Sequence, residues 1–335
     1  MMQGATWGGT PTFRQGFQRL LLVVKHTPYE LYTQLKAQGK APLALRWERL
    51  KNRHDIHLEC VETVKAVLMK HKVAFSAVGR EELDRQHISK VDLVIAVGGD
   101  GTVLSASHFL GSNIPLVGVN SDPNRPGESS GTKRTDERRS FGALCMCTSA
   151  DVEEELPKVL LREVEPQMRT RVQTSIKAST ATFTETRLPP ALNDVLIAHP
   201  SPAAVSRFRL GFSRSGEKLR GKPSRFNVWS SGIWISTATG STAAMKAAGG
   251  GGMHPFSGDM QYMVREHLVE KDMEHLRAYS QGIVPQGSKI HIRWGSQHGF
   301  VYIDGEHSRH PLSLGDELEI SGDAPPLYLY SQGSS

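Results

Sequence analysis

A glycine-rich turn that carries one carboxylate is the most informative chemical feature of the chain. Residues 98–102 read Gly-Gly-Asp-Gly-Thr and follow the apolar run 91–97. Glycines let backbone N–H groups approach phosphate oxygens, and a helix N-terminus, predicted here at the start of residues 103–110, favours anions. Asp100 is the one ionisable side chain of the turn, so it is the candidate general base. A plain strand-to-helix turn is the alternative interpretation.

Two polar stretches in the second half of the chain could contact a nucleotide. Asn193 offers a donor and an acceptor, and Asp194 accepts from hydroxyl groups, so together they could hold a ribose. An Asx-turn that opens the following strand is the alternative. Residues 236–252 are dense in small hydroxyl and glycine residues, which permit close backbone approach to a nucleotide. A linker is the alternative there, and the apolar Trp234 and Met245 argue against it.

Alternating strand and helix patterns are expected to position the glycine turn. Such alternation indicates a parallel α/β sheet, whose ligands bind beyond the carboxyl ends of the strands. The glycine turn lies at such an end. The predicted strands are 20–24, 73–75, 91–97 and 114–119, and the predicted helices are 59–71 and 103–110.

The pattern changes after a predicted helix at residues 150–164. Short strand candidates separated by Gly, Pro and Asp turns indicate a mostly antiparallel second domain. Before that helix, residues 121–140 are polar, highly charged and rich in Pro and Gly, which predicts a long mobile loop beside the site. The strand candidates are 289–294, 300–303, 317–320 and 327–330.

Length and composition exclude several classes of protein. The 335 residues, 38% of them hydrophobic and 22% charged, predict two domains. The sequence has no apolar run of the ~20 residues that a membrane span needs and no secretory signal, so we expect a cytoplasmic protein without a membrane partner. The net charge of +6 suits polyanionic ligands, but the basic residues are scattered, so no nucleic-acid partner is expected.

No side-chain pattern predicts a protein-bound metal. Cys145 and Cys147 have no second cysteine pair, so together with Cys60 they are predicted to be ordinary reduced thiols. Among 14 histidines, pairs three residues apart arise by chance. Two such pairs are predicted to be solvated on the surface: His54 with His57, and His307 with His310.

Three motifs in this order and at these separations resemble the signature of the NAD kinase family, over most of the chain: 98–102, Asn193-Asp194 and 239–243. Residues 119–123 and 254–259 bring the resemblance nearest to the plant-type NADH kinase branch. Two other functions stay open. A lipid kinase of the diacylglycerol or sphingosine type is disfavoured by the lack of an amphipathic membrane-binding stretch. A non-catalytic dinucleotide-binding sensor would not need a base in the turn.

The resemblance implies a fold, a reaction and an assembly. The expected fold is α/β plus β, with a Rossmann-like N-terminal domain over residues 19–150 and a β-sandwich-like, mostly antiparallel C-terminal domain over 165–322. Residues 323–335 are expected to form a C-terminal strand and tail. The implied reaction is ATP-dependent phosphorylation of the adenosine-ribose 2′-hydroxyl of NAD(H), favouring NADH, to make NADP(H). Mg²⁺ and a homo-oligomer, as a dimer, are implied as well.

The resemblance also assigns roles residue by residue. Asp100 matches the general base for the 2′-hydroxyl, and Gly99, Gly101 and Thr102 match residues that hold the ATP phosphates. Mg²⁺ is expected on those phosphates, with no metal ligand from the protein. The implied dinucleotide contacts are Asn193, Asp194, Thr239, Ser241, Thr242, Ala243, Lys246 and Ala247.

Three departures from the family pattern concern the dinucleotide. Ser231 stands where many members have an acid, and Ala244 replaces a common tyrosine. Both changes weaken the attraction for the cationic nicotinamide of NAD⁺ and therefore favour NADH. The usual Gly-His-Leu-Gly-Phe loop is missing after Asn120, and residues 142–145 match it only in part. Part of the nicotinamide-side contact therefore stays unassigned.

Overall fold

Two compact units make up the described part of the chain. The computed structural model describes residues 16–123, 140–180, 185–214, 217–218 and 225–332. The N-terminal unit comprises the chain up to residue 106, residues 112–167 and the chain from 328, while the C-terminal unit comprises 107–111 and 168–327. Most of the predicted loop at 121–140 lies outside the described residues. The domain limits predicted from the sequence stay a prediction.

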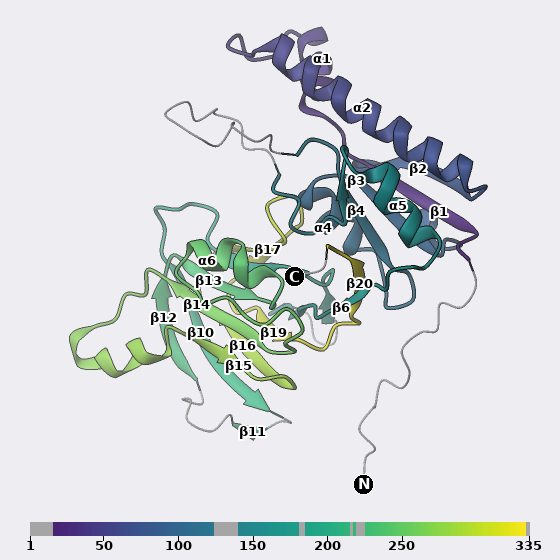
Figure 1. The fold of residues 1–335 in the computed structure, drawn as a ribbon. Helices are drawn as coiled ribbons and strands as arrows, with labels where there is room; N and C mark the ends of the chain where they lie inside the picture. Colours follow the sequence, from purple (N-terminus) through teal and green to yellow (C-terminus); the bar gives the residue numbers. More distant parts are fainter. Residues whose placement is uncertain (1–15, 124–139, 181–184, 215–216, 219–224, 333–335) are drawn as a thin grey trace. The chain divides into compact units, whose positions relative to one another are not determined.

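A seven-stranded sheet forms the centre of the N-terminal unit, in the order β2-β1-β3-β4-β20-β6 with β5 beside β4 (Figure 1). β1 pairs in parallel with β2 and β3, and β4 pairs in parallel with β3, β5 and β20. β3 and β4 are buried along their whole length, as expected for central parallel strands. The elements are β1 (Arg19–Val24), α1 (Pro28–Ala37), α2 (Trp47–Lys70), β2 (Ala74–Gly79), η1 (Arg80–Glu82), α3 (Arg85–Ile88), β3 (Leu93–Gly98), α4 (Asp100–Ser107), β4 (Leu116–Asn120), β5 (Cys147–Thr148), α5 (Val152–Leu160), β6 (Gln167–Arg169) and β20 (Leu327–Tyr330).

Local sequence signals explain how α1 begins. Thr27 and Glu30 form a capping box at α1, and Pro28 occupies its first turn.

The long helix α2 lies beside α5 and packs on β2 and β3 (Figure 1). It buries an apolar stripe that includes Val61 and Val64. α2 thereby covers the sheet that includes β3, the strand that ends at the glycine turn.

Two antiparallel sheets form the C-terminal unit. One has the order β11-β10-β16-β19-β7-β8 with β12 beside β10, and the other has the order β15-β14-β13-β9-β17-β18. β12 and β16 alternate buried and exposed residues, which is the pattern of strands with one face on a core. The elements are β7 (Gln173–Lys177), β8 (Glu185–Arg187), β9 (Asp194–Ala198), β10 (Ser206–Arg214), β11 (Glu217–Lys218), β12 (Phe226–Ser230), β13 (Gly232–Ser236), η2 (Gly240–Thr242), α6 (Ala244–Ala247), β14 (Met260–Arg265), η3 (Lys271–Tyr279), β15 (Gln281–Val284), β16 (Ser288–Trp294), β17 (His298–Ile303), β18 (Arg309–Ser313) and β19 (Glu317–Ser321).

The expected fold class, α/β followed by antiparallel β, is confirmed, and three details differ from expectation. α2 begins at Trp47, twelve positions before the predicted start at residue 59, because its polar first half hides the apolar period. α4 begins at Asp100 itself, since the N–H groups of Thr102 and Val103 both donate to the Gly99 carbonyl. Strand β20 joins the N-terminal sheet in parallel with β4 rather than the antiparallel sheets of the second half.

No helix of the described residues has both the length and the apolar character needed to cross a membrane.

Candidate active site

The glycine turn connects the carboxyl end of β3 to the first turn of α4. A Cβ on Gly98 would collide with the Thr102 side chain, and one on Gly99 would lie 2.5 Å from the Ser140 Cβ. At Gly101, by contrast, a Cβ would meet no heavy atom within 4 Å. The turn is therefore tight on its protein side and open beside Gly101. The N-terminus of α4, an eight-residue helix, lies beside this opening, and the dipole of the helix favours an anion there.

Asp100 is held by hydrogen bonds from a second segment, residues 140–144. Its Oδ1 accepts from the Leu144 backbone N–H at 2.9 Å. Its Oδ2 accepts from the Ser140 hydroxyl at 3.0 Å and from the Gly142 N–H at 3.1 Å. A carboxylate has roughly four acceptor positions, so these bonds leave one position on Oδ1 for a substrate hydroxyl. The carboxylate is thus fixed in orientation and still able to accept a proton.

The segment that holds Asp100 is itself shaped by β4. The Asn120 side-chain amide donates to the Ser140 carbonyl at 3.2 Å, and the Met146 N–H donates to the Gly118 carbonyl at 2.8 Å. Gly142 has a φ of +71°, a left-handed conformation that favours glycine. Sequence reasoning found only a partial loop match at 142–145 and missed its contact with Asp100. The glycine and its distance from β4 were the available signals.

A cavity of about 310 Å³ opens beside the turn, within the N-terminal unit. Three cations that the sequence reasoning did not single out, Lys25, Arg53 and Arg80, form part of its wall. Lys25 follows β1 and Arg80 follows β2, two parallel strands that end at the same edge of the sheet, and Arg53 lies in the first half of α2. The lining residues are Lys25, Arg53, Arg80, Gly98, Gly99, Gly101, Thr102, Asn120, Asp122 and Ser140.

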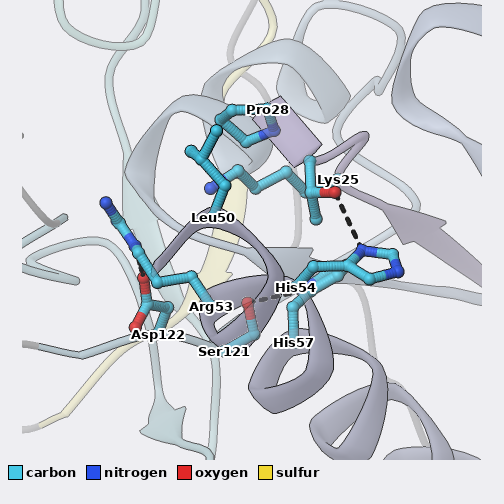
Figure 2. A pocket seen from close by; sticks show the side chains of 9 residues that line it. Lys25, Pro28, Leu50, Arg53, His54, His57, Ser121 and Asp122 are labelled. Carbon is cyan, nitrogen blue, oxygen red and sulfur yellow. Dashed lines mark hydrogen bonds and ion pairs between the residues drawn. The ribbon is translucent and has the colours of Figure 1, made fainter. Parts of the chain in front are cut away.

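A smaller pocket of about 20 Å³ shares Lys25, Arg53 and Asp122 with that cavity (Figure 2). Arg53 Nε donates to Asp122 Oδ2 at 2.7 Å, which fixes the guanidinium against the end of β4. Burial lowers the pKa of Lys25, and the positive charges of Arg53 and Arg80 lower it further. The carboxylate of Asp122 opposes this change.

His57 in this pocket corrects a prediction from the sequence. It is buried, with 3% of its surface exposed, and its Nδ1 lies 2.8 Å from the Ser121 hydroxyl. Burial, with the nearby Lys25 charge, lowers the pKa of His57 to about 4, so the ring is neutral at physiological pH. The residue three positions before it, His54, contacts the Thr27 hydroxyl at 2.9 Å. These two histidines therefore support the N-terminal unit from inside instead of forming a solvated pair.

In the C-terminal unit, one carboxylate organises the turn that contains Asn193 and Asp194. Asp304 accepts the backbone N–H groups of Leu192, Asn193 and Asp194 at 2.8, 2.7 and 3.1 Å. His108 Nε2 lies 2.9 Å from Oδ2 of the same carboxylate, the oxygen that also accepts the Leu192 N–H. Asp304 has a φ of +51°, an uncommon conformation for a non-glycine residue. Sequence reasoning missed Asp304, and the Asp-Gly pair after β17 was its only signal.

The serine- and threonine-rich turn packs directly on Asn193. The Thr237 hydroxyl donates to the Leu192 carbonyl at 2.6 Å, and the Thr237 N–H donates to the Asn193 carbonyl at 2.9 Å. A Cβ on Gly240 would collide with the Asn193 backbone, so only glycine fits there. Two motifs about 45 residues apart thus form one surface in this unit.

The predicted contacts in this turn differ in exposure. The Ser241 hydroxyl is buried, donating to the Ala238 carbonyl at 2.7 Å and accepting the Met253 N–H at 2.9 Å. It therefore shapes the turn. Thr239 is half-buried, and four other predicted contacts are exposed: Thr242, Ala243, Lys246 and Ala247.

Burial also perturbs the carboxyl group of Asp194. Only 6% of the residue surface is exposed, and no hydrogen bond to its carboxylate occurs among the described residues. Burial, reinforced by the negative charge of Asp304, raises the pKa of Asp194 to about 7. An unpaired buried acid is costly, which is typical of a group that a ligand completes.

The predicted site residues thus form two groups. Asp100, Gly99, Gly101 and Thr102 lie in the N-terminal unit. The predicted dinucleotide contacts, from Asn193 to Ala247, lie in the C-terminal unit. The described residues contain no group of three or more His, Cys, Asp or Glu side chains that could hold a metal ion.

Comparisons with known proteins agree with this geometry. Residues 26–122 match the family model described as the ATP-NAD kinase N-terminal domain. A probable NADH kinase of Oryza sativa subsp. japonica is 41% identical over 85% of this chain and 86% of its own length. An NADH kinase of Arabidopsis thaliana is 38% identical over 93% of this chain and 95% of its own length.

Two solved structures share the fold at 17% sequence identity. Yeast NADH kinase complexed with NADH has a TM-score of 0.63, with 97% of this chain and 89% of that chain covered. An NAD kinase from Archaeoglobus fulgidus in complex with ATP has a TM-score of 0.62, with 94% of each chain covered. The identity and coverage of the two plant relatives, together with the matching motifs, show that this chain belongs to the NAD kinase family.

Proposed function

We propose that this protein transfers the γ-phosphoryl group of ATP to the 2′-hydroxyl of the adenosine ribose of NADH, forming NADPH and ADP. One observation carries the proposal: a carboxylate fixed by three hydrogen bonds stands at the start of a helix, beside a cation-lined cavity. The plant relatives that cover most of the chain are named NADH kinases, which supports the same reaction.

Asp100 is the proposed general base. The 2′-hydroxyl oxygen attacks the γ-phosphorus, the bond from that phosphorus to the β,γ-bridging oxygen breaks, and the hydroxyl proton passes to Asp100. A sugar hydroxyl is a weak nucleophile at neutral pH, so a correctly placed acceptor lowers the barrier. The loose transition state of phosphoryl transfer needs little covalent help, so positioning by the turn supplies much of the rate.

ATP enters this reaction as its Mg²⁺ complex. The ion neutralises phosphate charge, and Gly99, Gly101 and Thr102 are proposed to hold the phosphates through the opening beside Gly101. The dinucleotide contacts proposed for the C-terminal unit are residues that match the family motifs: Asn193, Asp194, Thr239, Thr242, Ala243, Lys246 and Ala247. Ser241 belongs to the same motif and is proposed to act by shaping the turn, since its buried hydroxyl bonds to Ala238 and Met253.

A preference for NADH over NAD⁺ belongs to the same proposal. Ser231 is half-buried, and its N–H donates to the Arg265 carbonyl, while Ala244 begins α6. Neither position offers a carboxylate or an aromatic ring to a cationic nicotinamide. Introducing an acid with Ser231→Asp should shift the kcat/KM ratio toward NAD⁺ by roughly fivefold to tenfold, the value of one partly exposed charge contact. A shift toward NADH would contradict the charge argument.

The direct test is the reaction itself. Purified protein with Mg-ATP and NADH should form NADPH, measured by enzymatic cycling, and Asp100→Asn should lower kcat by at least ~10²-fold while the chain stays folded. Near-normal turnover of that variant would remove Asp100 from the mechanism. A lipid kinase would phosphorylate diacylglycerol or sphingosine in a parallel assay, and a sensor would bind dinucleotide without turnover.

Assembly and compartment are further parts of the proposal. The family resemblance supports a homodimer, which light scattering of the purified chain would test. The cytoplasm is the proposed compartment, which imaging of the tagged protein would test.

A further inference from the structure

A second cavity, of about 290 Å³, lies on the C-terminal unit, where β12, β10 and β16 run side by side (Figure 1). On these strands Phe208, Val228 and Trp294 belong to the buried core of the unit. Because successive side chains of a strand point to opposite faces, the residues next to them face outward. Those outward residues line the cavity, and it shares no residue with the predicted site residues.

Three arginines gather in this cavity. Arg209 of β10 lies directly opposite Arg293 of β16, and Arg207 stands two positions earlier on the same face of β10. Like charges directly opposite each other destabilise a sheet. At Arg209, β10 has β12 on one side and β16 on the other, so this arginine does not protect an exposed sheet edge. A bound anion would offset the repulsion.

No carboxylate of the described residues forms an ion pair with any of these three arginines. Arg209 Nε donates to Asn227 Oδ1 at 3.3 Å, and this neutral partner orients the guanidinium without cancelling its charge. Glu317 lies opposite Arg293 in β19 but is not part of the cavity lining. The positive charge of the cavity is therefore available to a ligand.

Trp229 adds a flat apolar surface to the same cavity. The Arg207 guanidinium lies 5.5 Å from its ring centroid, and the residue is still 49% exposed. Nucleic-acid bases stack on exposed tryptophan rings, and a neighbouring arginine adds a cation–π contribution. Guanidinium groups bind phosphate oxygens in pairs. The volume is near the lower end, ~300 Å³, of the range for small-molecule sites, so it suits a single nucleotide.

We propose that this cavity is a second nucleotide site, in which the base stacks on Trp229 and a diphosphate is bound by Arg207, Arg209 and Arg293. Inorganic phosphate alone would not need the exposed indole, and an apolar ligand would not need the arginines. Asn227 acts as the residue that positions Arg209. This site goes beyond the proposed phosphoryl transfer, because a nucleotide bound here would leave the glycine turn free.

Calorimetric titration with ADP tests the inference. The double variant Arg209→Gln/Arg293→Gln should bind one ADP fewer per chain than wild type, or bind it at that site at least tenfold more weakly. The control Arg187→Gln/Lys271→Gln removes two charges from exposed positions of the same unit outside the cavity and should bind ADP like wild type. The difference of one site does not depend on ADP binding at the glycine turn, so failure of the proposed kinase reaction would leave this test valid.

A second variant separates stacking from charge. Trp229→Leu keeps an apolar side chain but removes the ring, so the ADP affinity of this site should fall roughly tenfold. Inorganic pyrophosphate should still bind this variant within about threefold of its affinity for wild type. Thermal melts check that all variants stay folded.

Three results would overturn the nucleotide site. The first is an equal number and affinity of ADP sites in wild type and the double arginine variant. The second is a changed sedimentation coefficient of that variant with unchanged ADP binding, which would assign the arginines to a contact between copies of the chain. The third is binding of a single-stranded oligonucleotide that the variant loses while it keeps every ADP site.

Discussion

Replacing Asp194 by Asn should stabilise the protein at alkaline pH and weaken its function. The carboxyl group is buried, faces Asp304, and accepts no hydrogen bond among the described residues. An amide of the same shape carries no charge, so Asp194→Asn removes the cost of ionisation without opening a cavity. The hydrogen bond from the Asp194 backbone N–H to Asp304 persists, because it does not involve the side chain.

The size of this effect follows from the pKa of Asp194, raised from 3.8 to about 7. Between these values the folded chain holds a proton that the unfolded chain has released. Unfolding then releases that proton, so stability falls as pH rises through this window. From about pH 5 to pH 8, this linkage should lower the free energy of unfolding of wild type by about 2 to 3 kcal/mol. The variant should not show this loss. For a unit of this size that corresponds to roughly 5 to 10 °C in melting temperature.

Scanning calorimetry at both pH values provides the measurement, and Asp272→Asn, an exposed carboxylate of the same unit, is the control. The Asp304 carboxylate acts on Asp194, and the His108 ring contacts that carboxylate. Both groups are unchanged in the variant. Asp194→Asn should also raise KM for NADH, because the amide accepts ribose hydroxyls less strongly. If the melting temperatures of wild type and variant differed equally at both pH values, the reasoning from the raised pKa would be refuted.

Three further predictions concern the loop that holds Asp100, a buried arginine and the metal. Gly142→Ala should lower kcat at least ~10-fold, whereas the control Ala143→Gly should not lower it. A Cβ at residue 142, where φ is +71°, would lie 2.6 Å from the Asn120 amide and displace a donor to Asp100. Arg171→Met should lower the free energy of unfolding by at least ~3 kcal/mol, because Arg171 donates to the Ser107, Leu110 and Pro325 carbonyls. Thermal melts provide the measurement, and Arg187→Met, at an exposed position, is the control. EDTA should abolish activity and Mg²⁺ should restore it without a change in far-UV circular dichroism; a cooperative loss of that signal would instead reveal a structural metal.

Elements with a strong local period were predictable from the sequence, and long-range pairings were not. The apolar strands β1, β3 and β4 and the alternating β16 could be recognised because their burial repeats within a few residues. The parallel pairing of β20 with β4 could not, since nothing local specifies which sheet a buried strand joins.

The sequence by itself determined the chemistry of this protein. Three motifs can be recognised in the sequence because each needs particular residue types: the glycine turn with one acid, the Asn-Asp pair and the small-residue turn. Glycine satisfies the backbone of the turn, and a carboxylate supplies the base of the reaction.

Only the tertiary structure decided how those residues are held. The donors to Asp100 come from residues 140–144, the support of Asn193 comes from Asp304, and the cavity cations come from three separate elements. Such contacts join positions about 40 to 110 residues apart. Every residue except proline offers the same backbone N–H, so the sequence does not show which of these groups bond to Asp100. An arginine that lines a cavity cannot be told from a surface arginine by sequence, because only packing distinguishes the two.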